Sequence, residues 1–503
     1  MICRRFGILG VLLFSSLVAI AQLTQSKRIE LPLEDNPSSY DVINLEDKGL
    51  LLFRSDFGFD ENGRNWNFIR LDTALNVVWS KQFSIDASLK YAKYTSTLEK
   101  GYLLFTDSRK GLNLNLVEVD IVSGEAKQHT IRNFIPFQLS HFKASDFGVF
   151  IGGSYNYRPL VVYYNLLNRT SMILPGFYHE RSELLQIKVN VNQRVDVITS
   201  SVSYGSWNKM ILQLKSFDKD GNMIQDVLLD GIQDNKSLLF GRSCYENRGT
   251  QLVAGTYARR KSEYSRGLFI AAVNEMGEYD INYYSYGDLT NFFGYMKKKR
   301  EERVKARIER KRMKNKNARF NYRLLVHGIM EYEDQFILLA EAFYPKYIHP
   351  TGGQIAGFFV GQRATTEAIF DGYRYTHAVV AGFDSTGKLL WDNSFEIKDI
   401  KTFDLKQLVH VNIQDDKIVL LYVYQNQIRS KIIEGNQVVE GKDYNDIALT
   451  FTDDQLINKS ISDLNFWYDK YFYVFGNQNI RNVKDLNVKL ERRVFYINKV
   501  YYD

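Results

Sequence analysis

The feature of this sequence that most limits its fold is a unit that recurs about every 45–55 residues. Each unit holds an apolar run, a polar turn, a second strand-like run and a turn often written Asp-x-x-Gly. The apolar runs are Gly49–Phe53, Gly101–Phe105, Phe147–Gly153, Arg194–Ser200, Thr250–Thr256, Gln335–Ala342, Lys417–Tyr424 and Lys470–Gly476. Short strands and tight turns at this period are typical of a β-propeller, in which each repeat forms one four-stranded sheet, or blade.

The number of units predicts an all-β, eight-bladed β-propeller. The eighth unit ends its third strand at Tyr502, so it lacks a fourth. Ser26–Leu33 alternates like a strand and precedes the inner strand of the first unit, Tyr40–Leu45. Because an unpaired edge leaves backbone groups unsatisfied, we predict that Ser26–Leu33 pairs with Arg492–Tyr502 and closes the ring. A seven-bladed ring with one unit outside it is the alternative.

The N-terminus has the pattern of a secretory signal peptide over residues 1–21. Arg4 and Arg5 precede an apolar run of about 15 residues, and small residues precede a cleavage point between Ala21 and Gln22. An uncleaved membrane anchor is the alternative. We therefore expect residues 22–503 to form a single propeller domain in the periplasm or at the periplasmic face of the outer membrane. That part keeps one cysteine, Cys244, so no internal disulfide is expected.

The largest break in the repeat is a basic insertion at residues 297–319. It holds 13 Lys or Arg against three Glu, so its net charge is +10 and the rest of the chain contributes −3 to the total of +7. Its composition and the Glu301–Lys305 spacing predict a helix, with Val304 and Ile308 as a narrow apolar stripe.

The basic helix has several possible uses. It could be a solvated surface helix, a docking element for an acidic protein surface, or a contact for anionic lipid or lipopolysaccharide. Nucleic acid is not expected as a partner, because the secretory leader directs the protein away from the cytoplasm and no aromatic residues stand between the charged ones. The candidate partner-binding residues here are Lys305, Arg307, Arg310 and Lys311.

A second insertion, at residues 343–377, is predicted to be a Gly-rich apolar loop. Long loops on a rigid scaffold commonly carry binding function. Its Phe358, Phe359 and Val360 are poor choices for a solvated loop, so they either pack on the propeller face or enter a partner. With the basic helix they are predicted to form one docking surface.

The sequence contains no recognised catalytic, cofactor or metal motif, so no catalytic residue, cofactor or metal is assigned. Its seven His residues have no ligand spacing, although His349 and His377 flank the second insertion. Asp218–Asn222 is similar to the start of a calcium loop but lacks the Glu at the twelfth position. It stands where the other units turn, which indicates a hairpin turn.

Phe383–Trp391, FDSTGKLLW, resembles the repeat of the pyrroloquinoline-quinone type of propeller through Asp384, Gly387 and Trp391. Asp72 and Trp79 match that repeat in part. The resemblance implies that the Gly forms the turn and that the Trp docks between blades. We therefore expect Trp79 and Trp391 to be buried at blade interfaces. The residues that bind quinone and calcium in those dehydrogenases have no counterpart here.

The composition, rich in Tyr, Asn and Lys, resembles that of secreted envelope proteins of the Bacteroidota. These features together favour a non-catalytic periplasmic binding or scaffold propeller. By analogy it would be an accessory subunit of an outer-membrane complex, such as a cap or plug of a type IX-like secretion translocon, with a protein partner such as an outer-membrane barrel. The alternative is a carbohydrate-active hydrolase or lyase with acidic residues around the central channel.

Overall fold

The computed structural model describes residues 23–33, 38–60, 63–107, 113–132, 135–177, 181–203, 205–245, 251–348, 368–398, 400–414, 417–434, 437–458, 461–485 and 488–502. The predicted signal peptide and the candidate residues Phe358, Phe359 and Val360 lie outside these ranges. No helix in the described ranges has the length and apolar character needed to cross a bilayer.

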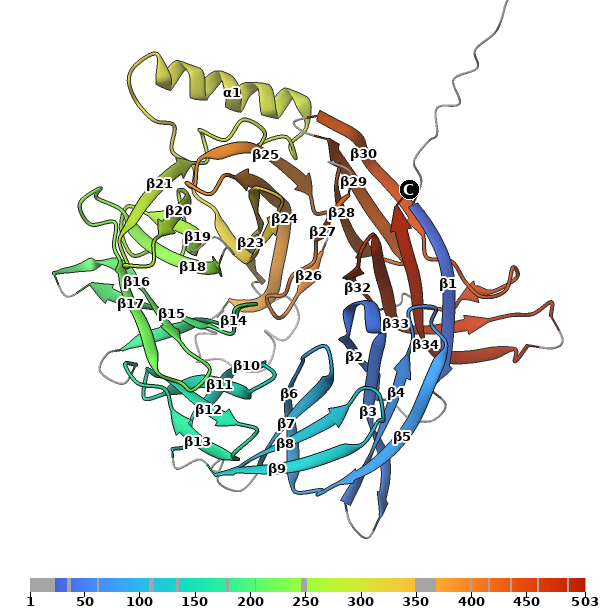
Figure 1. The fold of residues 1–503 in the computed structure, drawn as a ribbon. Helices are drawn as coiled ribbons and strands as arrows, with labels where there is room; N and C mark the ends of the chain where they lie inside the picture. The colour runs from blue at the N-terminus through green and yellow to red at the C-terminus, as the bar shows by residue number, and fades with distance from the viewer. Residues whose placement is uncertain are drawn as a thin grey trace, which may run out of the picture.

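Eight antiparallel sheets are arranged in a ring, which confirms the eight-bladed propeller (Figure 1). The first four blades are β2 (Asp41–Asn44), β3 (Leu50–Asp60), β4 (Gly63–Leu71), β5 (Val77–Ile85); β6 (Leu89–Ser96), β7 (Lys100–Asp107), β8 (Asn113–Asp120), β9 (Ala126–Arg132); β10 (Gln138–Ala144), β11 (Gly148–Tyr155), β12 (Arg158–Asn165), β13 (Thr170–Ile173); and β14 (Ser182–Val189), β15 (Val195–Ser203), β16 (Ser206–Phe217), β17 (Met223–Leu229).

The other four blades follow the same order, and two of them carry an extra short strand. They are β18 (Ser237–Tyr245), β19 (Gln251–Ala258), β20 (Gly267–Val273), β21 (Tyr279–Ser285); β22 (Arg323–Tyr332), β23 (Gln335–Ile348), β24 (Ile369–Phe383), β25 (Leu389–Glu396) with β26 (Lys401–Thr402); β27 (His410–Gln414), β28 (Lys417–Tyr424), β29 (Gln427–Glu434), β30 (Gln437–Asp446); and β32 (Ile461–Tyr468), β33 (Tyr471–Arg481), β34 (Glu491–Tyr502), β1 (Leu23–Pro32) with β31 (Gln455–Leu456). A 3-10 turn, η1 (Glu46–Lys48), joins β2 to β3.

The N-terminal strand closes the ring as predicted. β1 pairs antiparallel with β34, from Leu23 opposite Tyr502 to Pro32 opposite Val494. The backbone N–H of Leu33 then donates to the carbonyl of Arg493 at 3.0 Å. The pairing begins at Leu23, three residues before the predicted start, and passes a register shift between Gln25 and Lys27. The last blade thereby gains its outer strand from the other end of the chain.

The first strand of most blades, which faces the ring axis in Figure 1, contains a bulge. The shifts lie between Tyr91/Lys93, Leu139/His141, Leu184/Gln186, Leu238/Phe240, Val326/Ile329 and Phe466/Tyr468. A bulge inserts a residue whose backbone groups leave the ladder and whose neighbours are turned to new directions. The channel-facing strands therefore carry free backbone carbonyls as well as re-aimed side chains.

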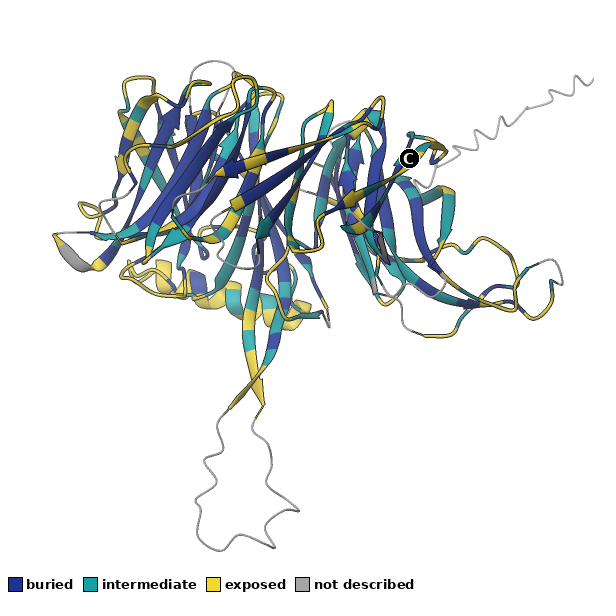
Figure 2. Cartoon of the chain, turned by 90° about the horizontal axis from the view of Figure 1, so that it is seen from below, coloured by how far each residue is buried: buried dark blue, intermediate teal, exposed yellow. Residues whose placement is uncertain are grey.

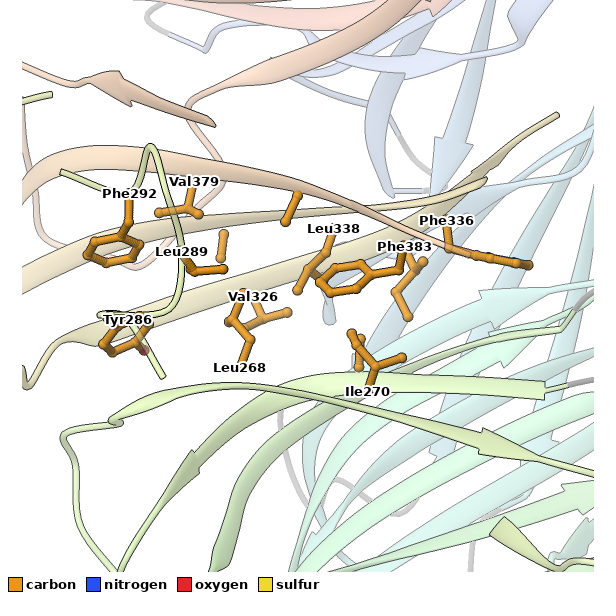
Figure 3. Packing of buried hydrophobic residues seen from close by; sticks show 14 of the residues in the cluster. Leu268, Ile270, Tyr286, Leu289, Phe292, Val326, Phe336, Leu338, Val379 and Phe383 are labelled. Carbon is orange, nitrogen blue, oxygen red and sulfur yellow. The ribbon is translucent and has the colours of Figure 1, made fainter. Parts of the chain in front are cut away.

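Apolar clusters fill the spaces between neighbouring blades. Figure 3 shows the cluster between the fifth and sixth blades, where Leu268 and Ile270 of β20 face Phe336 of β23 and Phe383 of β24. β19 is buried along its whole length, because its sheet is covered on both faces. The cluster continues under the segment after β21 through Tyr286, Leu289 and Phe292.

The Asp-x-x-Gly turns are held by their Asp side chains. Asp384 Oδ1 accepts the backbone N–H groups of Thr386 at 3.0 Å and Lys388 at 2.9 Å, and Gly387 has φ +77°. Asp218 Oδ1 accepts Asp220 and Asn222 in the same way, at 2.9 and 2.8 Å. Its carboxylate is therefore a turn cap, as the hairpin interpretation requires.

The two repeat tryptophans dock as the resemblance implies, but they are half-buried rather than buried. Trp79 Nε1 donates to the carbonyl of Ile121 in the second blade at 2.9 Å. A Cβ on Gly124 would lie 2.9 Å from the Trp79 ring, so only Gly fits there. Trp391 Nε1 donates to Gln335 Oε1 of its own blade at 2.8 Å, and its ring packs against the apolar cluster between the sixth and seventh blades. Both side chains follow β-turns onto outer strands and are of intermediate exposure.

The basic insertion forms the helix α1 (Lys298–Arg312), which ends earlier than the predicted 297–319 segment. The second insertion corrects the sequence prediction. Its two ends, predicted as loop, continue β23 to Ile348 and begin β24 at Ile369, so they lengthen a hairpin. The backbone groups of the two extended strands hydrogen-bond to each other, and Tyr347 packs against Phe370. In the edge-on view of Figure 2, α1 and the outer end of this hairpin lie on the same side of the disk.

Candidate functional site

The helix α1 is held against the propeller by its apolar stripe. Ile308 is buried and Val304 packs partly against the cluster between the fifth and sixth blades. The i,i+4 pair Glu301–Lys305, at 2.7 Å, supports the helix beside this stripe. The stripe fixes which cations face the fifth blade and which face solvent.

A hollow of about 740 Å³ lies between α1, the segment that follows it, and the fifth blade. Its cationic lining residues are Lys236, Arg259, Arg266, Arg307, Lys311, Lys316 and Arg319. Asp234 is its one carboxylate. A second hollow of about 390 Å³ shares Arg259 and Arg266 and adds Arg260 and Lys261. The two hollows form one strongly basic region.

The cations of this hollow lack carboxylate partners among the residues that the structure describes. Within the described ranges, none of the seven cations of the larger hollow forms an ion pair with a carboxylate. Lys236 Nζ instead lies 4.8 Å from the ring centre of Tyr257, and the Arg307 guanidinium lies 5.8 Å from that of Phe320. The site therefore presents uncompensated positive charge beside two aromatic rings.

A buried lysine positions the blade side of the hollow. Lys209 Nζ donates to Asn235 Oδ1 at 2.8 Å and to the carbonyl of Arg259 at 2.6 Å. It thus ties together the segments that carry Lys236 and Arg259. Burial lowers the pKa of Lys209, and the neighbouring positive charges of Arg259, Arg260 and Lys236 lower it further. The effect of these neighbouring cations on Lys209 is consistent with a positive electrostatic potential in this region.

Of the four basic residues predicted on α1, the structure places two in the hollow and two outside it. Arg307 and Lys311 line the hollow. Lys305 is exposed and pairs with the partly buried Glu301, and Arg310 Nε donates to the carbonyl of Ala306 at 3.2 Å on the exposed helix surface. The blade residues of the hollow were missed by the sequence prediction. The run Arg259-Arg260-Lys261 was a visible signal, whereas the isolated Lys236 and Arg266 gave none.

A second candidate region lies along the central channel. Two hollows of about 370 and 410 Å³ share Tyr94, Phe142 and Lys143. The bulged Leu185 offers its free carbonyl to His141 Nε2 at 3.2 Å and to the Arg242 guanidinium. Burial, followed by the charge of Arg242, lowers the pKa of His141 to about 4, so its imidazole is neutral near pH 7.

Two acidic residues of channel-facing strands lie near these hollows but do not line them. Burial raises the pKa of Tyr94, which lines both hollows, and the charges of Asp41 and Asp463 raise it further. In the part of the chain that the structure describes, neither channel hollow is lined by Asp or Glu. Asp463 of β32 pairs with Lys406 at 2.5 Å. The fully buried Glu341 accepts the N–H groups of Leu408 at 3.0 Å and Val409 at 2.6 Å, so it joins the sixth and seventh blades. Glu341 therefore has a structural role.

The described residues contain no group of three or more potential metal ligands. His349, expected to meet His377, lies outside the described residues. His377 itself is fully buried and stacks on Tyr295, with ring centres 3.7 Å apart.

No protein-family model matches the chain, and no curated protein matches it at a significant level. Among solved structures, it is similar to the quinohemoprotein alcohol dehydrogenase ADHIIG from Pseudomonas putida HK5, with a TM-score of 0.41 and 8% identity over 95% of this chain and 76% of that one. The polysaccharide lyase Uly1 gives a TM-score of 0.39 and 10% identity, with 95% and 99% covered. The β-propeller domain of the Trilobed protease from Pyrococcus furiosus gives 0.36 and 9%, with 80% and 97% covered. At this level, the likenesses bear on neither activity nor ligand.

Proposed function

We propose that the protein is a non-catalytic binding propeller that docks an acidic protein surface on one side of its disk. The observation that carries the proposal is the excess of positive charge on α1, a helix anchored to a rigid ring, on which Lys305 and Arg312 are the only cations paired with a carboxylate among the described residues. Lys305 and Arg310 are exposed on that helix and represent its outer surface. Exposed charge of one sign steers an oppositely charged partner and speeds association.

The lengthened hairpin supplies an apolar contact on the same side of the disk (Figure 2). Tyr347 and Ile369 are each 54% exposed, and Tyr347 packs edge-on against Phe370 with ring centres 5.8 Å apart. Exposed aromatic and aliphatic side chains on a paired, rigid strand suit an interface anchor. We therefore propose a docking surface that consists of the exposed cations of α1 together with the hairpin residues Tyr347 and Ile369.

The proposed setting is the periplasm, because of the N-terminal leader pattern, and the Bacteroidota type of envelope is proposed from the composition alone. There the protein would be an accessory subunit of an outer-membrane complex, for example a cap or plug of a type IX-like translocon, with a membrane barrel as its partner. This setting rests on the leader, on the composition and on analogy.

The test is purification of the tagged protein from its native membranes in mild detergent. We expect one complex to co-purify with the wild type and with the control K127E/R132E, which alters the exposed outer strand of the second blade. The variant K305E/R310E should bind more slowly and lose the salt dependence of association. The variant Y347S/I369S should dissociate faster. A complex that both variants retain unchanged would refute the docking surface, and cytoplasmic fractionation would refute the setting.

A lyase for acidic polysaccharides is the second candidate, favoured by neutral His141 among channel cations. Such a reaction breaks the C4–O bond of a uronate residue after a base removes the C5 proton. His141 Nδ1 would take the C5 proton, the C5 electron pair would form the C4=C5 double bond, and the leaving O4 would take a proton from water. Lys143 would stabilise the charge on the sugar carboxylate. Incubation with a panel of polyuronates should then give unsaturated products that absorb in the ultraviolet, and H141Q should abolish them. No absorbance change with any polyuronate would refute it.

A further inference from the structure

We infer that the hollow between α1 and the fifth blade is a binding site for a ligand that carries two or more phosphate groups. This site is separate from the exposed docking surface proposed above, and neither inference depends on the other. Seven cations and a single carboxylate line the hollow. Like charges held together repel one another, so a multivalent anion that enters is stabilised by all of them.

The shape of the hollow favours a small ligand over a protein surface. Its volume of about 740 Å³ lies in the range of cavities that enclose cofactor-sized molecules. Phe320, which is half-buried, lines the same space and offers apolar ring surface beside the cations, whereas Tyr257 is buried beneath Lys236. A sugar or another ring that carries the phosphates would find an apolar contact there.

The cation types favour phosphate. Arg259, Arg266, Arg307 and Arg319 contribute guanidinium groups, whose planar forks match pairs of phosphate oxygens. The blade side is already in place before any ligand arrives. Arg266 is half-buried, its N–H donates to the carbonyl of Tyr257 at 2.8 Å, and its carbonyl accepts the N–H of Tyr286 at 3.2 Å. Lys209 fixes the neighbouring segment that carries Arg259. A preformed site loses less entropy on binding.

Phosphate groups of this kind occur in soluble compounds and in lipid headgroups, and the experiment separates the two sources. Titration calorimetry with sodium tripolyphosphate tests the soluble source. Flotation with phosphatidylcholine vesicles, with and without diphosphoryl lipid A, tests the headgroup source. Binding to tripolyphosphate alone supports a soluble ligand, and binding to both supports a headgroup that reaches the hollow.

The variants place the binding in the hollow. R307Q/K311Q should weaken tripolyphosphate binding by about tenfold or more, because two charge-assisted contacts are removed. R266Q, on the blade side, should weaken it as well. The matched control K298Q/K299Q removes two exposed cations from the same helix outside the hollow and should change the dissociation constant by less than about twofold.

Three results would overturn the inference. The first is that the protein binds neither tripolyphosphate at millimolar concentration nor lipid A vesicles. The second is equal weakening by R307Q/K311Q and K298Q/K299Q, which would show a diffuse charge effect. The third is equally tight binding of citrate, a tricarboxylate, which would show that the hollow does not select phosphate.

Discussion

Glu30 and Arg492, which lie at opposite ends of the chain, form a mostly buried ion pair across the strands that close the ring. Glu30 Oε2 accepts Arg492 Nε at 2.9 Å, and the side chains are 13% and 11% exposed. Arg492 also donates to Asp454 Oδ1 at 2.9 Å, and Arg28 pairs with Glu30 at 2.8 Å. Burial alone would raise the pKa of Glu30 and of Asp454, but the hydrogen bonds from Arg492 lower both. The two ends of the chain are therefore joined by a cluster of ion pairs.

Removing Arg492 should strongly destabilise the ring. The change R492M leaves Asp454, whose side chain is fully buried, without its main cation. Loss of one partner of a buried pair costs about 3–5 kcal/mol. Urea unfolding at pH 7 measures the loss. The control R481M removes an exposed cation of the same blade, from the 3.7 Å pair with Glu491, and should cost at most about 1 kcal/mol.

The same pair gives a pH test. The pKa values of Glu30 and Asp454 are lowered in the folded protein, so their contribution is present above the unfolded values near 4 and is lost as the pH falls through the lower folded values. The stability difference between wild type and R492M should therefore shrink below about pH 4. If the difference in unfolding free energy stayed constant down to acid pH, the ion pairs of Arg492 would not contribute to stability as stated.

Deletion of residues 23–33 should expose an unpaired edge. β34 pairs with β1 over nearly its whole length, so its backbone groups would face solvent without β1. Exposed edges pair with other chains. We expect concentration-dependent oligomers in size-exclusion chromatography with light scattering. A stable monomer of unchanged melting temperature would show that the closing strand is dispensable.

The tryptophans should differ in their contribution to stability. Trp467, which the repeat pattern did not single out, is 1% exposed and donates to the carbonyl of Gly49 at 3.2 Å, so it joins the last blade to the first. W467A should cost about 3–5 kcal/mol. W79A should cost less, roughly 1–3 kcal/mol, because Trp79 is half-buried. Chemical denaturation measures the loss of unfolding free energy in each variant. A larger loss in W79A than in W467A would mean that docking between blades contributes more to stability than burial does.

His377 should make the protein sensitive to mild acid. Burial lowers its pKa to about 3, and it stacks on Tyr295. Between about pH 6.5 and 3 the unfolded chain binds a proton that the folded chain does not, so stability falls as the pH falls through this window. The melting temperature of H377F should fall less steeply than that of wild type between pH 7 and 4. His141 and His410, whose burial lowers each pKa to about 4, should leave a residual slope in the variant. Parallel curves would show that His377 is solvated.

The sequence by itself determined the eight blades and their closure. These features follow from local patterns: the spacing of apolar runs, the Asp-x-x-Gly turns, and the missing fourth strand that Ser26–Leu33 supplies. The basic helix was also visible, because composition and i,i+4 pairing decide helix formation within a short segment. The ends of the second insertion were misjudged as loop, because pairing between Tyr347 and Phe370 depends on a partner strand and not on local propensity.

Tertiary structure alone decided the site. The sequence placed thirteen cations in one insertion, but only the packing of Ile308 determines that Arg307 and Lys311 face the fifth blade. Lys236 and Arg266 join them from segments about 40 to 80 residues away, where nothing in the local sequence marks them. Trp467 was equally hidden, since its carbonyl partner, Gly49, lies 418 residues away along the chain. Contacts of this kind form when the ring closes, and a repeat pattern carries no information about which residues of different blades then meet.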